Sequence, residues 1–330
     1  IMKYQPSAER YDKMQYKYCG NSGLLLPRIS LGLWHNFGSV DDFGVATDMI
    51  KYAFDNGVTH FDLANNYGPS YGSAEETFGQ IMKSSFAPYR DELFISTKAG
   101  HDMWPGPYGN WGSRKHLMAS LDQSLKRMNL DYVDVFYSHR YDPETPLEET
   151  LQALVDIVRK GKALYVGLSK YPLDAYLFAC RYLKERDVPC LLYQGRYSML
   201  VREPESQGIL NAVKENGSGF VAFSPLAQGL LTNRYLNGIP DDSRIARGGF
   251  LKKEALTPEV LSKIQALNER AAMRGQSLAE MALAWLLKNE TVTSVIVGAS
   301  SVEQLGDSLK TLNHLSFEEE ELHAIEKILM

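Results

Sequence analysis

The sequence predicts a (β/α)8 barrel, and three observations support this fold class: the number, the spacing and the composition of short apolar runs. Eight such runs, rich in β-branched and aromatic residues, lie at residues 28–34, 59–64, 93–99, 132–139, 163–169, 190–196, 219–225 and 293–299. Most begin about 27 to 39 residues apart, the length of one strand, one helix and two loops. The runs are apolar almost throughout, as parallel strands covered on both faces are.

Helical patterns fill the gaps between these runs. Two apolar stripes have helical spacing, one made of Leu117, Leu121, Leu125 and Met128 and the other of Leu147, Leu151, Leu154 and Val158. Ser/Thr-x-x-Glu sequences at residues 73–76, 145–148 and 277–280 predict helix starts, the second with Pro146 at the first helical position. Strand and helix therefore alternate eight times.

Three segments lie outside this repeat. Residues 14–19 and 24–27 flank the turn GNSG and predict an N-terminal β-hairpin that closes the bottom of the barrel. Between the seventh and eighth strands, residues 231–255 predict a long loop and residues 257–274 an extra helix, and another extra helix is expected at the C-terminus. No linker divides the chain, so we expect one domain over residues 1–330, with a doubly wound open sheet as the competing fold.

Composition excludes several classes of function. Lys and Arg number 35 against 40 Asp and Glu, a net charge of −5 without long runs of one sign, so nucleic acid is not an expected partner. Cys19, Cys180 and Cys190 lack the spacing of a disulfide framework or a zinc site. No apolar run is long enough to span a membrane, and the start lacks the apolar core of a signal peptide. We expect a cytoplasmic protein; the oligomeric state is left open, a homo-oligomer included.

Four ionisable residues lie at the ends of three successive predicted strands. Asp62 is near the end of the second strand, Tyr67 is in the glycine-rich loop after it, Lys98 is near the end of the third strand and His139 ends the fourth. Active sites of such barrels form at the C-terminal ends of the strands, and neighbouring strands are about 4.8 Å apart. The four side chains are therefore expected to converge.

The chemistry of this group is that of carbonyl reduction. A carboxylate beside Lys98 keeps the amine charged, and a fixed ammonium near a phenol is expected to lower the pKa of Tyr67 from its ordinary value of about 10. Tyr67 would then protonate a carbonyl oxygen that His139 orients, and no metal is needed. Each residue alone also fits a structural ion pair, a packed tyrosine or a buried core histidine.

The motifs SLGLWHNFG, HFDLANNYGP, GSAEETFG, ISTKAGHDMWPGPYG, LDYVDVFYSHR and FSPLAQGLLTNRYLNGIPDDSR resemble the aldo-keto reductase superfamily. The similarity extends from about residue 14 to about residue 312. The family's catalytic Asp, Tyr, Lys and His map onto Asp62, Tyr67, Lys98 and His139. Within the superfamily, the motifs are similar to bacterial L-glyceraldehyde 3-phosphate reductases and, more distantly, to voltage-gated potassium-channel β subunits.

The resemblance implies a nicotinamide cofactor, although no GxGxxG motif follows a strand. It implies that Ser169 and Gln194 hold the carboxamide, that Phe223 stacks on the ring, and that Trp34, Ser224, Leu226 and Gln228 add contacts. Gly298, Ser300 and Gln304 lie at a predicted helix start that would attract phosphate. Arg234 and Arg244 in the long loop favour NADPH over NADH. Lys170, Phe223 and Ser198 depart from the residues most common in the superfamily.

For the substrate site we expect Trp34, Tyr67, His139 and Arg140, with aromatic walls from the loop at residues 101–116. Arg140, Arg114 and Lys115 are candidates to meet a phosphate, or are solvated charges. We expect small aldehydes as substrates, such as L-glyceraldehyde 3-phosphate or methylglyoxal.

Two other functions remain open. One is a redox-sensing NADP(H)-binding subunit resembling the channel β subunits, which carry Asn where His139 stands. The other is a barrel isomerase or aldolase that uses Lys98 as a Schiff base, although the pairing with Asp62 would keep that amine protonated.

Overall fold

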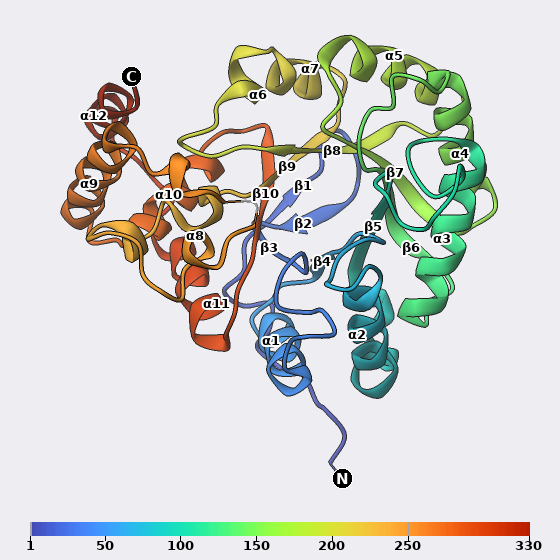
Figure 1. The fold of residues 1–330 in the computed structure, drawn as a ribbon, viewed down its shortest axis with the longest axis horizontal. Coiled ribbons are helices and arrows are strands. Elements are labelled where there is room, and N and C mark those ends of the chain that lie inside the picture. Colours follow the sequence, from blue (N-terminus) through green and yellow to red (C-terminus); the bar gives the residue numbers. More distant parts are fainter. Residues whose placement is uncertain (1, 250) are drawn as a thin grey trace.

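A computed structural model of the chain, which describes residues 2–249 and 251–330, contains a closed barrel of eight parallel strands (Figure 1). The strands in barrel order are β3 (Ile29–Gly32), β4 (His60–Asp62), β5 (Phe94–Ala99), β6 (Val133–Ser138), β7 (Ala163–Ser169), β8 (Cys190–Arg196), β9 (Gly219–Phe223) and β10 (Val292–Val297). Because β10 also pairs with β3, the sheet has no free edge. The predicted barrel is confirmed and the open sheet is excluded.

Helices surround the barrel (Figure 1). They are α1 (Phe43–Asp55), α2 (Ser73–Ile81), α3 (Arg114–Met128), α4 (Leu147–Arg159), α5 (Leu173–Lys184), α6 (Glu203–Ser206), α7 (Ile209–Glu215), α10 (Leu278–Leu287) and α11 (Val302–Leu309). A π-helical segment, η1 (Met82–Phe86), and a 3-10 helix, η2 (Ala87–Glu92), follow α2, and η6 (Lys310–Asn313) follows α11. Both predicted apolar stripes face inward, because α3 and α4 bury Leu121 and Leu151 completely.

The three predicted helix starts are confirmed to within one residue, because α2, α4 and α10 begin at Ser73, Leu147 and Leu278, but only one of the three expected side-chain caps has formed. The Ser277 side chain accepts the backbone N–H of Glu280 and starts α10. The cap expected from Ser73 has not formed, because its hydroxyl donates to the Ser70 carbonyl and Gly72 is the cap residue. The cap expected from Thr145 has not formed either, because Pro146 is the cap residue and its side chain has no acceptor for a backbone N–H.

The predicted N-terminal hairpin is present as β1 (Tyr16–Tyr18) and β2 (Leu25–Pro27), paired antiparallel. Cys19 and Leu26 of this hairpin are fully buried and belong to the same apolar cluster as Leu192 and Val221 of the barrel strands. The hairpin therefore closes the end of the barrel that faces away from the C-terminal ends of the strands. Among the described residues, no helix is both long and apolar enough to cross a membrane.

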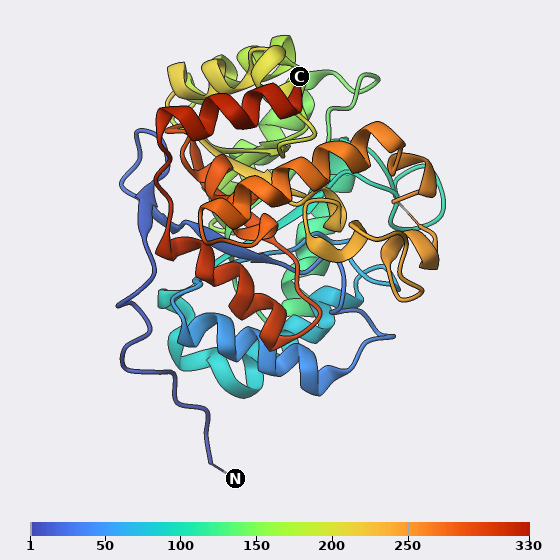
Figure 2. The same cartoon turned by 90° about the vertical axis from the view of Figure 1, so that its left-hand side faces the viewer.

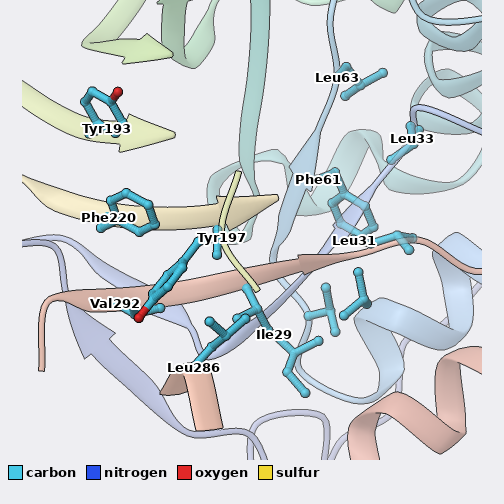
Figure 3. Close-up of a cluster of buried hydrophobic side chains, with 14 of the residues drawn as sticks. Ile29, Leu31, Leu33, Phe61, Leu63, Tyr193, Tyr197, Phe220, Leu286 and Val292 are labelled. Carbon is cyan, nitrogen blue, oxygen red and sulfur yellow. The ribbon is translucent and has the colours of Figure 1, made fainter. Parts of the chain in front are cut away.

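Strand residues alternate between an outer layer against the helices and an inner layer inside the barrel. Figure 3 shows part of the outer layer, including Leu31 of β3, Phe61 of β4 and Phe220 of β9. Phe61 packs against Phe78 of α2, with ring centroids 5.8 Å apart. Since Phe61 faces outward, its neighbours His60 and Asp62 face the barrel axis.

The predicted extra helices are α9 (Pro258–Met273) between β9 and β10 and α12 (Glu319–Leu329) at the C-terminus, which lie side by side (Figure 2). Arg274 at the end of α9 pairs with Glu321 of α12 at 2.9 Å. The segment 231–255, predicted as a loop, contains η4 (Asn233–Tyr235), α8 (Arg244–Arg247) and η5 (Lys253–Ala255) in its described residues, and η3 (Ala227–Gly229) precedes it. Residue 250 of this segment lies outside the described part.

A buried ion pair joins α2 to α3. Glu75 is fully buried, and its carboxylate lies 2.9 Å from Arg127 of α3. It also accepts hydrogen bonds from Thr97 and Ser124. Burial raises the pKa of Glu75 above its ordinary value, although these partners favour the charged form. The carboxylate therefore depends on its partners to stay charged.

We expect the Arg127→Met variant to lose about 3 kcal/mol in free energy of unfolding at neutral pH, because a buried charge is left without its partner. Urea denaturation measures this loss. In the variant, folding should raise the pKa of Glu75 further, so the folded state binds a proton that the unfolded state releases. The deficit should therefore shrink as the pH falls through that raised pKa. The double variant Arg127→Met with Glu75→Gln should recover much of the lost free energy of unfolding. A loss equal to that of Arg127→Met alone would show that an unpaired Glu75 charge is not its cause.

Candidate active site

Asp62, Tyr67 and Lys98 meet at the C-terminal end of the barrel, in direct contact. The Lys98 ammonium, which is fully buried, donates to the Asp62 carboxylate at 2.8 Å and to the Tyr67 hydroxyl at 2.9 Å. Its third donor goes to the Leu63 carbonyl at 2.7 Å. The predicted convergence of these three side chains is therefore present, and every proton of the ammonium has an acceptor.

A chain of buried hydrogen bonds supports Asp62 from inside the barrel. Ser96 of β5 donates to Asp62 at 2.7 Å and lies 3.0 Å from Nε2 of His60. The Nδ1 atom of His60 lies 2.8 Å from the Ser30 hydroxyl of β3. These residues face the axis because they alternate with outward apolar residues on their strands. The network was not predicted from the sequence, although the strand register would have revealed it.

The expected fall in the pKa of Tyr67 is wrong for this structure. Burial raises the pKa of the phenol, and the lowering by the Lys98 charge does not offset it. Burial also lowers the pKa of Lys98, but Asp62 and Tyr67 outweigh that and raise it above its ordinary value. Tyr67 therefore keeps its proton at neutral pH, and Lys98 keeps its charge. A protonated phenol held by a cation is arranged to give up a proton when an adjacent oxygen gains negative charge.

His139 lies directly after β6, beside Tyr67, as predicted. The two ring centroids are 6.2 Å apart and the rings meet edge to face. Burial and then the Lys98 charge hold the pKa of His139 well below its ordinary value, with His101, Lys170 and Arg140 adding to the effect. The imidazole is thus neutral, with one N–H to donate and one nitrogen to accept. Its Nδ1 is buried without a partner among the described residues.

A groove opens beside Tyr67 at the C-terminal ends of the strands. Most of the predicted cofactor residues line it, namely Trp34, Phe223, Ser224, Leu226, Gln228, Arg234, Arg244, Gly298 and Gln304, together with Asp62 and Tyr67. Ser300 lies beside the groove, where its N–H and hydroxyl both donate to Gln304. Ser169 and Gln194 are paired across β7 and β8, and Gln194 donates to Asp62 at 3.2 Å.

The groove is bordered by an unusual backbone and by two arginines in different environments. Ser224, Ala227 and Gln228 have positive φ angles of 49°, 50° and 56°, so the backbone after β9 is held in an uncommon conformation around the groove. Arg244 is partly buried, with no ion pair to any described residue, and one of its nitrogens lies 3.9 Å from where a Cβ on Gly298 would be. Arg234, by contrast, pairs with Asp242 at 3.0 Å. The site thus combines an apolar face with a free cation near a helix start.

The structure gives partners to the other predicted charges and adds residues to the predicted set. Arg114 pairs with Asp156 at 2.6 Å, and the Lys115 ammonium lies over the Tyr108 ring, so each is engaged away from the groove. Arg140 donates to the Gly100 carbonyl at 3.0 Å. Residues lining the groove that were not predicted are Gly32, His35, Pro225, Gly229, Thr232, Tyr235, Ile296 and Val297. Gly32, Ile296 and Val297 end β3 and β10, so the strand-end rule alone would have found them.

Comparison with known proteins shows the family to which the chain is similar. A model of the aldo/keto reductase family matches residues 28–330. The chain is 55% identical to the L-glyceraldehyde 3-phosphate reductase of Escherichia coli (strain K12) over 331 residues, which cover 99% of this chain and 95% of the relative. It is 37% identical to a probable voltage-gated potassium channel subunit beta of Arabidopsis thaliana over 306 residues, 91% of this chain and 92% of the relative. The predicted resemblance is confirmed.

We expect the imidazole of His139 to stay neutral between pH 8 and pH 5.5, because burial and the neighbouring cations hold its pKa well below the ordinary value. Imidazole nitrogen shifts in two-dimensional NMR measure this, with His139→Gln used to assign the signal. Removing one of these charges with Lys98→Met should move the pKa of His139 upward. A normal titration near pH 6.5 in the unaltered protein would contradict this description of the site.

Proposed function

The chain belongs to the aldo/keto reductase family, and we propose that it is an enzyme of this family that reduces small aldehydes to alcohols with NADPH. The observation that carries the proposal is the contact of the Tyr67 hydroxyl with the Lys98 ammonium at 2.9 Å, at the edge of the groove. A proton donor held by a buried cation beside a ligand groove is what carbonyl reduction requires.

In the proposed reaction, Tyr67 gives its proton to the carbonyl oxygen. When bound, the nicotinamide supplies the hydride that reduces the carbonyl carbon, so the product is an alcohol. Lys98 stabilises the negative charge that the phenol acquires, and Asp62 keeps Lys98 charged and in place. His139, as a neutral imidazole, donates a hydrogen bond that orients the substrate oxygen. Lys98 is not a Schiff-base nucleophile in this proposal, because its three protons are engaged and its pKa is raised.

The residues of the groove support the choice of cofactor. Ser169 and Gln194 would hold the carboxamide at the ends of β7 and β8, and Phe223 would stack on the ring. Gly298, Ser300 and Gln304 would meet phosphate oxygens at the start of α11. Arg244, which has no ion pair among the described residues, would hold the pyrophosphate or the 2′-phosphate and favour NADPH.

Two short aldehydes are the proposed substrates. L-glyceraldehyde 3-phosphate is suggested by the names of the similar Escherichia coli proteins, and methylglyoxal is the unphosphorylated candidate of similar size. Trp34 at the groove supplies an aromatic wall.

The three cysteines are free thiols, in keeping with action in a reducing cytoplasm. We also propose that residues 1–330 work as one barrel domain.

A regulatory NADP(H)-binding subunit is the second candidate, favoured by the 37% identity to probable potassium channel β subunits. His139 beside Tyr67 supports the enzyme instead, because it supplies the group that orients a substrate oxygen. A rate of cofactor oxidation that no aldehyde increases would favour the regulatory candidate.

We expect Tyr67→Phe to bind NADPH but to lose about 10²-fold or more in kcat, because the proton donor is removed while the groove is kept. The rate of NADPH oxidation with a panel of aldehydes measures the loss, and fluorescence of bound NADPH checks binding. A variant as fast as the unaltered protein would remove Tyr67 from the mechanism.

We expect Arg244→Met to weaken binding of NADPH by about tenfold or more and binding of NADH less, because a charge-assisted bond to phosphate is lost. Arg247→Met is the matched control, since Arg247 lies on the same short helix, α8, but is exposed and does not line the groove. Titration of each cofactor against both variants measures the difference. Equal losses in the two variants would show that Arg244 contributes only general charge.

A further inference from the structure

Three basic side chains follow three neighbouring strands at the mouth of the barrel. His101 comes two residues after β5, Arg140 two residues after β6, and Lys170 directly after β7. The Lys170 ammonium lies 3.3 Å from Nε2 of His101. The backbone of Lys170 has a φ of 57°, a conformation that is uncommon for a residue other than glycine and that recurs at functional sites.

This cluster lies next to the proposed catalytic residues. The rings of His101 and His139 meet edge to face with centroids 4.4 Å apart, and His139 in turn is next to Tyr67. Arg140 is held by the Gly100 carbonyl, by Asn110 and by stacking on Trp111, with its Cζ 3.6 Å from the ring centroid. Its Nη1 atom has no hydrogen-bond partner among the described residues, so a donor remains for a ligand.

The positive charge of the cluster is only partly balanced by the protein, because Asp142 and Asp102 act on Arg140 without forming an ion pair with it. Among residues 2–249 and 251–330, no carboxylate forms an ion pair with Lys170 or Arg140. Asp142 is near Arg140, but its carboxylate accepts backbone N–H groups of Gly112, Glu144 and Thr145. Burial and the charges of Lys98 and Arg140 lower the pKa of Lys170 to about 8. Burial and then Lys170 lower the pKa of His101 to about 4.

Such a cluster is stabilised by an anion. We propose that His101, Arg140 and Lys170 form a subsite that binds the phosphate of the substrate, so that this protein selects short aldehydes carrying a phosphate monoester. This inference rests on the proposed reductase function and extends it by naming the residues that set specificity. With a carbonyl oxygen at Tyr67, the far end of a three-carbon substrate is directed past His139 toward these side chains.

The chemistry of the cluster favours phosphate over a carboxylate. A phosphate monoester is mostly a dianion at pH 7 and has three terminal oxygens, and the three side chains offer donors from three directions. Binding such a dianion would also stabilise the protonated form of His101, which the free protein disfavours. A neutral aldehyde such as methylglyoxal gains none of these interactions.

Binding of unreactive analogues tests the subsite apart from catalysis. Calorimetric titrations would compare glycerol 3-phosphate, glycerate and glycerol, each added to protein saturated with NADP⁺. We expect glycerol 3-phosphate to bind at least about tenfold more tightly than glycerol, the effect of one hydrogen bond to a charged group. Lys170→Gln and His101→Gln should each reduce that preference about tenfold, whereas Lys170→Arg should keep most of it.

Lys184→Gln is the matched control, because Lys184 is an exposed lysine at the end of α5, away from the mouth. It should leave the preference unchanged. Glycerol 3-phosphate binding no more tightly than glycerol, glycerate binding more tightly than both, or equal effects of Lys170→Gln and Lys184→Gln would each overturn the subsite. NADPH oxidation with unphosphorylated glyceraldehyde tests the reductase function separately, since it does not need the phosphate group.

The same variants can also be tested by steady-state kinetics. The ratio of kcat/KM for glyceraldehyde 3-phosphate to that for glyceraldehyde should fall about tenfold in Lys170→Gln, because only the first substrate reaches the subsite with its phosphate. A ratio that stays at the value of the unaltered protein would count against the proposal. The Lys184→Gln protein should keep the original ratio.

Discussion

The buried ammonium of Lys98 is the charge on which the rest of the site depends. Burying an ion costs several kcal/mol unless it is paired and fully hydrogen-bonded, and Lys98 meets this condition with three acceptors. All three, Asp62, the Leu63 carbonyl and Tyr67, come from β4 or the chain directly after it, whereas Lys98 is on β5. The pairing of β4 with β5 therefore sets the position of the proposed proton donor, because a shift in register would leave the cation unsatisfied.

The barrel can hold this charge because its two layers have different roles. The outer layer between strands and helices is apolar and supplies most of the buried surface. The inner layer is apolar near the hairpin and polar toward the mouth, where His60, Ser96 and Asp62 form one hydrogen-bonded chain. Stability thus comes mainly from side chains that face the helices, which leaves the inward positions near the strand ends available for chemistry.

The strands and the convergence of the proposed catalytic residues could be predicted because each depends on a local pattern. Apolar runs mark strands such as β6, and strand ends mark Asp62 and Lys98. The cap at Ser73 could not be predicted, since the loop before it supplies Gly72 and the Ser70 carbonyl as alternatives. The cluster of His101 and Lys170 was also missed, because their contact joins residues 69 apart that only the closed barrel brings together. Likewise, the raised pKa of Tyr67 depends on how completely the fold buries the phenol.

The raised pKa of Tyr67 and the basic cluster at the mouth of the barrel belong to one electrostatic arrangement. In the proposed reaction, the buried phenol of Tyr67, whose pKa is raised, holds its proton until negative charge develops on an adjacent oxygen, and Lys98 then stabilises the charge left behind. Burial, together with the cations beside His139, keeps that imidazole neutral, so in the proposed reaction it would orient the oxygen without competing to donate a full proton. The proposed proton donation by Tyr67 and the proposed anion binding at the mouth therefore share the same positive potential, and a phosphorylated substrate would bring the charge that balances it.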